Sequence, residues 1–211
     1  LEARIAESLA WIAKNGETDT ETALACAAVG DEVALARAEA IINTALPGIE
    51  QCYDCADFAL VPLLWTRIVF ADRLPASLVA RIDAAILEFR YWMDEPGNDV
   101  QWYFSENHAL LFHTSAYLAG NLLPQSHFRR ADRNGTAQKQ AGYERLMAWF
   151  DHFEAAEMAE FNSGTYFPID LKGLAALFAL APDEVIRKRA SGAITRLITM
   201  IANSAHHGVI T

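Results

Sequence analysis

The stretch from Gln101 to His113 gathers side chains that could carry chemistry. An aromatic run comes first, then a helix N-cap signal, then three hydrogen-bonding side chains: Trp102, Tyr103 and Phe104; Ser105; Glu106, Asn107 and His108. The last three lie in the first turn of an apolar helix that we expect to end near Gly120. Serine is a favoured N-cap because its oxygen accepts a hydrogen bond from an otherwise unpaired backbone N–H. The positive end of the helix dipole disfavours imidazolium, so His108 is expected to be a neutral base.

A plainer interpretation of this stretch is a well-capped helix. In that case neighbouring loops satisfy the Asn107 and His108 side chains, and neither residue has a chemical role.

A second group of polar and aromatic residues precedes a later apolar helix: Glu160, Asn162, Ser163 and Tyr166. The loops at about 46–53, 93–105 and 156–168 each lead from an amphipathic helix into an apolar one. We therefore expect them at the same end of a helical layer, where their polar groups converge on a cleft. Loops are polar in most proteins, and this is the competing explanation.

Composition sets the class of protein. The chain has 211 residues, 53% of them hydrophobic, and this is enough to bury the core of a single domain spanning 1–211. The net charge of −10 argues against binding to nucleic acid, which needs a basic face. No uncharged apolar run reaches the length of a membrane span, so no membrane partner is expected.

Hydrophobic periodicity and capping signals predict helices almost throughout the chain. The eight helices are expected at about 2–14, 31–45, 55–71, 76–92, 106–120, 137–155, 169–180 and 183–204. Pro47-Gly48 is expected to end the second helix, Asp54 to cap the third, and Pro62 to kink or break the third.

The third, fifth and seventh of these helices are apolar nearly all round, whereas the fourth, sixth and eighth carry a charged stripe. An apolar helix is buried and an amphipathic one lies outside, so the alternation predicts antiparallel hairpins in two layers. The predicted fold is all-α, an incomplete (α/α) toroid. We expect the chain to be a fragment of a longer protein, because it stops at His206 to Thr211 just past a helix and closed toroids contain more hairpins.

The Asn107-His108 pair, followed by Glu160 to Tyr166, resembles the (α/α)-toroid polysaccharide lyases, in particular the heparinase II/III-like and alginate-lyase-like group. In that group an Asn-Asn-His context and a later Glu-x-Ser-…-Tyr segment are common. The resemblance covers about 50–205. Glu106 stands where the group has the first Asn, and no Arg lies near Tyr166 to bind a uronate carboxylate.

The resemblance implies β-elimination on a uronate-containing oligo- or polysaccharide, without metal or cofactor, in a secreted or periplasmic protein. Asn107, His108 and Tyr166 are the catalytic candidates. Asn107 would stabilise the developing carboxylate charge, and His108 or Tyr166 would take the α-proton. The residues expected to bind substrate are Trp102, Tyr103, Glu106, Glu160 and Asn162.

Two other functions fit the same residues. A glycoside hydrolase on this fold would use two carboxylates, Glu106 with either Glu160 or Asp99. Glu106 in place of a neutral amide favours this alternative, as does the negative charge, which suits a neutral glycan. The third alternative is a non-catalytic helical module that binds a glycan or a protein.

A metal site is not expected. Cys52 and Cys55 form one C-x-x-C with Cys26 to spare, which is too few cysteines for a four-ligand zinc site. His113 lies five residues after His108 and points to a different helix face.

Overall fold

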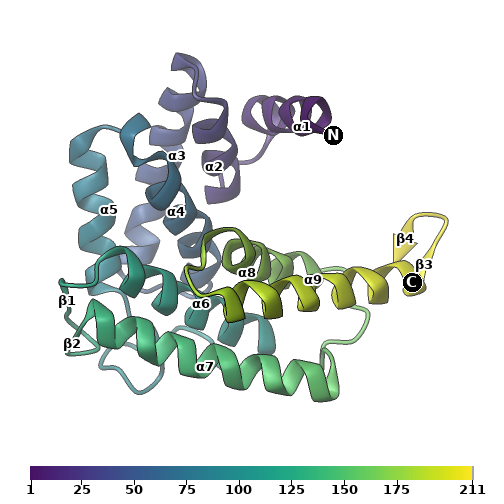
Figure 1. Cartoon of the computed structure of the whole chain (residues 1–211). Coiled ribbons are helices and arrows are strands. Elements are labelled where there is room, and N and C mark those ends of the chain that lie inside the picture. The colour runs from purple at the N-terminus through teal and green to yellow at the C-terminus, as the bar shows by residue number, and fades with distance from the viewer. Residues whose placement is uncertain (211) are drawn as a thin grey trace. The chain divides into compact units, whose positions relative to one another are not determined.

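The computed structural model describes residues 1–210 and is all-α (Figure 1). Nine α-helices lie in this range: α1 (Glu2–Asn15), α2 (Thr20–Val29), α3 (Glu32–Glu50), α4 (Ala56–Phe70), α5 (Ala76–Glu88), α6 (Glu106–Leu122), α7 (Gly135–Ala156), α8 (Phe167–Leu180) and α9 (Glu184–Ser204). The remaining elements are short: a 3₁₀ turn, η1 (Ala71–Arg73), and the strands β1 (His127–Phe128), β2 (Arg133–Asn134), β3 (Ala205–His206) and β4 (Val209–Ile210). The expected continuation past the C-terminal residue Thr211 lies outside the described residues.

The chain forms two compact units. Unit 1 comprises Leu1–Gln101 with Ser126–Arg133, and unit 2 comprises Trp102–Gln125 with Asn134–Thr211. The candidate residues of the lyase hypothesis all belong to unit 2, whereas Asp99, the alternative carboxylate of the hydrolase hypothesis, belongs to unit 1.

Unit 1 contains a helix that we did not expect. Residues 20–29, which lie between the first two expected helices, form α2. Asp19 is its N-cap and accepts a hydrogen bond from the Thr22 backbone N–H at 2.8 Å. Gly30 ends it with φ 78°, a left-handed conformation that glycine adopts without steric cost. The helix packs on α1, α3 and α4 through small side chains, which give no amphipathic pattern in the sequence.

Two prolines lie inside helices of unit 1. Helix α3 continues through Pro47 to Glu50, so the helix end expected at Pro47 is wrong, and α4 continues through Pro62 without a break. An interior proline costs about 3 kcal/mol in a helix. Burial offsets this cost in α4, because Leu60, Val61 and Leu63 are fully buried and each contributes roughly 1.5–3 kcal/mol. Packing therefore overrides the local signal.

Two expected helix ends in unit 1 also differ. The N-cap of α4 is Cys55, with φ 61°, and not Asp54. Helix α5 ends at Glu88 and not at 92. Arg90 and Tyr91 leave the helix because they find buried partners elsewhere. The Arg90 backbone N–H donates to Cys52 Sγ at 3.4 Å, and the Tyr91 hydroxyl donates to the carbonyl of Ile86 at 2.8 Å.

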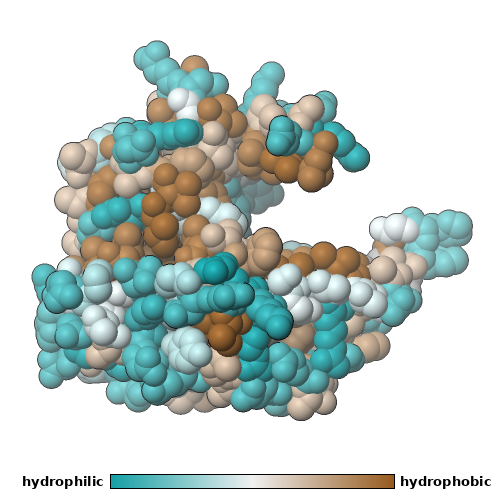
Figure 2. Space-filling view, viewed as in Figure 1, coloured by the Kyte–Doolittle hydropathy of each residue, from teal (hydrophilic) through white to brown (hydrophobic). Residues whose placement is uncertain are grey.

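Unit 2 is built on the α6–α7 hairpin. Helix α6 is buried along almost its whole length, whereas the side of α7 visible in Figure 2 is largely hydrophilic. The two helices are antiparallel, because Gly120 lies against Lys139 and Gly142 against Tyr117. The expected pairing of a buried helix with an outer one is present in this hairpin.

Gly142 permits the close approach of α6 and α7. A Cβ at this position would lie 2.5 Å from the Tyr117 backbone nitrogen, which cannot move without shifting α6. We expect Gly142→Ala to reduce the free energy of unfolding by about 1–3 kcal/mol. Gly192→Ala is the matched control: nothing lies within 4 Å of its Cβ position on α9, so it should add up to about 1 kcal/mol. Urea unfolding measures both, and a loss of equal size in the two variants would contradict the packing argument.

Helices α8 and α9 form the second hairpin of unit 2. Gly173 of α8 contacts Leu110 and Leu111 of α6, which places α8 against the buried helix. Helix α8 is less enclosed than its apolar sequence suggests, because Phe178 is 52% exposed. Closure of the hairpins into a toroid stays a prediction.

Candidate functional site at the start of helix α6

A hydrogen bond joins the two polar segments expected to meet. The Asn107 side-chain amide donates to the Glu160 carboxylate at 2.7 Å, across 53 positions of sequence. Asn107 is fully buried in the first turn of α6, and Glu160 is partly exposed in the loop before α8. Asn107 thus fixes the direction of the Glu160 carboxyl group. Because it is fully buried, Asn107 reaches a substrate only through Glu160.

Glu106 anchors the same loop. One oxygen of its carboxylate accepts from the backbone N–H groups of Ala159 at 2.5 Å and Glu160 at 3.4 Å. Its other oxygen lies 3.7 Å from Nε2 of His152, and its backbone carbonyl accepts from the Trp149 indole at 3.0 Å. These hydrogen bonds hold the loop before α8 to the first turn of α6.

Ser105 does not make the side-chain cap expected of it. Its backbone is extended, as at an N-cap, but its hydroxyl donates to Asn107 Oδ1 at 2.9 Å. The serine consequently orients the amide group that bonds Glu160. The sequence cannot distinguish a hydroxyl that caps the helix from one that bonds the Asn107 side chain, because a serine just before the first helical turn can do either.

Burial raises the pKa of Glu160, and the nearby Glu106 charge adds to this effect. The Asn107 hydrogen bond and the His108 ring act in the opposite direction without cancelling it. Glu160 thus remains neutral more readily than an ordinary carboxyl group.

Asp170, in the first turn of α8, is a site residue that the sequence reasoning missed. It is fully buried, and both of its carboxyl oxygens lack a hydrogen-bond partner. Burial, followed by the charges of Glu160 and Glu106, raises its pKa to about 8. The helix dipole would favour ionisation by at most about 2 kcal/mol, whereas burying an unpaired charge costs several. The available signal was an acidic residue in the first turn of a helix whose one other charged residue is Lys172.

Tyr166 lies at the same end of unit 2 as His108. The Glu106 charge contributes to the raised pKa of Asp170, and Gly173 lies against Leu110, so α8 begins alongside the beginning of α6. The Tyr166 backbone is held in place, because its N–H donates to Ser163 Oγ at 3.1 Å and its carbonyl accepts from the Asp170 N–H at 2.9 Å. Its side chain is 38% exposed.

The aromatic run divides into two environments. Trp102 and Phe104 are exposed and touch each other edge to face, with ring centroids 5.4 Å apart. Tyr103 is buried against Phe112 at 4.6 Å, so its ring is not available to a sugar in this structure. Phe161, beside Glu160, is 71% exposed and was not anticipated as a contact residue. Exposed aromatic rings can stack on sugars. Along the run, Trp102 and Phe104 are exposed on either side of the buried Tyr103, so only these two are available for stacking.

The other candidates are placed as follows. His108 is buried in the first turn of α6, with its ring 6.2 Å from that of Phe112 in a stacked arrangement. Asn162 has a left-handed backbone, φ 54°, and its side-chain oxygen accepts from the Ser204 hydroxyl at 2.5 Å. Asp99, the alternative second carboxylate, belongs to unit 1, where it pairs with Arg90 at 3.1 Å.

Among residues 1–210, no group of three or more His, Cys, Asp or Glu side chains is placed to hold a metal ion. Burial lowers the pKa of His113 to about 3, so this histidine is neutral. Cys26, Cys52 and Cys55 are free thiols, and only Cys55 is exposed.

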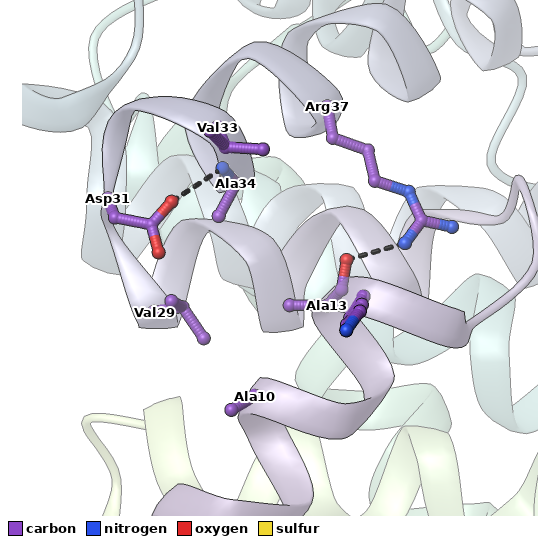
Figure 3. Close-up of a pocket in the computed structure, with 8 residues that line it drawn as sticks. Ala10, Ala13, Val29, Asp31, Val33, Ala34 and Arg37 are labelled. Carbon is purple, nitrogen blue, oxygen red and sulfur yellow. Dashed lines mark hydrogen bonds between the residues drawn. The ribbon is translucent and has the colours of Figure 1, made fainter.

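Two cavities of the described residues are lined by residues other than those of the cluster. In unit 1, a cavity of about 440 Å³ lies among α1, α2 and α3, bordered by Ala13, Asp31 and Arg37 (Figure 3). Asp31 and Arg37 are already bonded to backbone groups there, Asp31 to the Ala34 N–H and Arg37 to the Ala13 carbonyl. In unit 2, a cavity of about 630 Å³ lies at the opposite end of α6, where Lys139 pairs with Asp183 at 2.8 Å.

No protein-family model, curated protein or solved structure matches the chain. Within residues 1–210, no helix is both long enough and apolar enough to cross a membrane.

Proposed function

We propose that unit 2 cleaves a uronate-containing glycan by β-elimination at the cluster of Glu106, Asn107 and Glu160. The observation that supports this most directly is the Asn107–Glu160 hydrogen bond within a group of carboxyls. Two neighbouring acids with raised pKa values, Glu160 and Asp170, remain neutral more readily than ordinary carboxyl groups. A neutral carboxylic acid can donate a hydrogen bond to an anion, and the uronate carboxylate is such an anion.

The reaction needs few groups. A base takes the proton α to the uronate carboxylate, the electrons form a C=C bond, and the C4–O bond breaks. His108 and Tyr166 are the residues proposed for proton transfer, with the exposed Tyr166 phenol giving its proton to the leaving oxygen. Glu160, oriented by Asn107, would meet the negative charge that develops on the carboxylate.

One observation favours a hydrolase as the second candidate. The Glu106 carboxyl group accepts backbone N–H hydrogen bonds, whereas burial raises the pKa of the neighbouring Glu160. Two neighbouring carboxyl groups in different environments are what a glycosidase uses as base and acid. The exposed rings of Trp102 and Phe104 support the third alternative, a module that binds a glycan without cleaving it.

The product identifies the reaction. We expect absorbance in the enone band to rise when the protein is incubated with uronate polysaccharides, because β-elimination leaves a C=C bond conjugated with the carboxylate. New reducing ends without this absorbance would establish hydrolysis and overturn the lyase proposal. Binding without any cleavage would favour the non-catalytic module.

A further inference from the structure

We infer that Asp170 is a positioning residue that stays protonated beneath Glu106 and Glu160 and so limits the negative charge that a uronate substrate meets. This inference rests on the proposed function for the kind of substrate. The protonation itself depends only on the geometry of the site. Asp170 does not contact solvent, so it acts through Glu160 and not directly on the substrate.

The geometry leaves Asp170 without the means to carry a charge. A buried carboxylate is normally stabilised by a cation or by several hydrogen bonds. Both oxygens of Asp170 are buried and unbonded. The charged groups that act on it are Glu160, from the loop before α8, and Glu106, from α6, and both repel a third negative charge.

Helix α9 also packs on α8, but its arginines are engaged elsewhere. Arg187 donates to the carbonyls of Ala181 at 2.6 Å and Pro182 at 2.8 Å. Arg189 pairs with Asp151 at 2.7 Å and with Glu154 at 2.9 Å, and Arg196 pairs with Glu157 at 2.9 Å. The last two cations are held by α7 and the residue that follows it. They do not offset the charge that ionisation of Asp170 would create.

Asp170 therefore determines the charge of the site as a function of pH. Below about pH 8 the acid is neutral, and the site contains at most the charges of Glu106 and Glu160. Above that pH it acquires a third charge at a place where no partner compensates it. A uronate carboxylate would then meet stronger repulsion, whereas a neutral sugar would not.

Thermal unfolding tests the protonation without any substrate. In the unfolded chain Asp170 loses its proton near pH 4, whereas the folded chain retains it to about pH 8. Rising pH therefore favours the unfolded state across this window. We expect the Tm of wild type to fall relative to that of Asp170→Asn between about pH 4 and 8. Parallel Tm profiles in the two proteins would overturn the inference.

Carboxyl ¹³C NMR tests whether the charge on Asp170 affects the Glu160 carboxyl group. The signal that is missing from the spectrum of Glu160→Gln identifies the Glu160 resonance. In wild type we expect the Glu160 signal to show a second inflection near pH 8, when Asp170 ionises. Asp170→Asn should remove this inflection, and the control Asp151→Asn, on the exposed side of α7, should keep it. An inflection that persists in Asp170→Asn, or is missing from wild type, would overturn the inference.

The kinetic test separates a positioning role from a structural one. With a uronate polymer that the protein cleaves, we expect the KM of wild type to rise above about pH 8 and that of Asp170→Asn to stay level. Equal KM profiles would overturn the positioning role even if the Tm profiles differ. If no glycan is cleaved, the proposed function fails, while the Tm and NMR results still decide whether Asp170 sets the charge at Glu160.

Discussion

Tyr166→Phe is expected to reduce glycan cleavage by about 10²–10⁴-fold, the usual contribution of general acid–base assistance. The change removes only the phenolic proton, which the proposed β-elimination delivers to the leaving oxygen. The fold should be unaffected, because the side chain is 38% exposed and its hydrogen bonds to Ser163 and Asp170 run through the backbone. Steady-state rates of enone formation measure the loss, and circular dichroism confirms that the variant is folded.

Glu106→Gln is the matched comparison for this prediction. In the lyase scheme Glu106 anchors the loop through the Ala159 N–H, and the amide oxygen of glutamine can accept the same bond. Appreciable activity should therefore remain. In a hydrolase Glu106 is one of two essential carboxylates, so the same change would remove nearly all turnover. A dead Glu106→Gln beside a fully active Tyr166→Phe would end the lyase proposal.

Phe112→Ala is expected to destabilise the protein by about 3–5 kcal/mol, a loss that urea unfolding detects readily. Phe112 is fully buried in α6, and its ring lies 4.6 Å from that of Tyr103. Removing it leaves a cavity that the hairpin cannot close, because α7 already lies against the α6 backbone at Gly142.

His108→Ala should cost less, about 1–3 kcal/mol, although the histidine is also buried. It lies in the first turn of α6, where the backbone can relax more easily than in mid-helix. Activity should fall far more than stability, because His108 is a candidate for proton transfer. If His108→Ala unfolds the protein as severely as Phe112→Ala, His108 is a packing residue and its catalytic role is excluded.

The sequence alone was sufficient for the class of fold. Apolar periodicity and caps predicted the all-α character that the structure shows. Apolar residues spaced three or four positions apart lie on one face of a helix, and that face is buried. The errors arose where packing overrode local signals. Helix α2 was missed because its alanines form no stripe, and the helix end at Pro47 was wrong because buried neighbours offset the cost of that proline.

The sequence also identified the polar start of α6 and the loop containing Glu160, because hydrogen-bonding residues there come directly before or at the start of apolar helices. Only the tertiary structure decided how they are used. Asn107 bonds Glu160, and Tyr103 is turned into the core. Asp170 became recognisable only when α8 packed against α6, because a carboxyl group acquires an altered pKa from burial and from charges distant in sequence. Residue types specify which chemistry is available, whereas the packing of helices decides which groups stay protonated and which face a substrate.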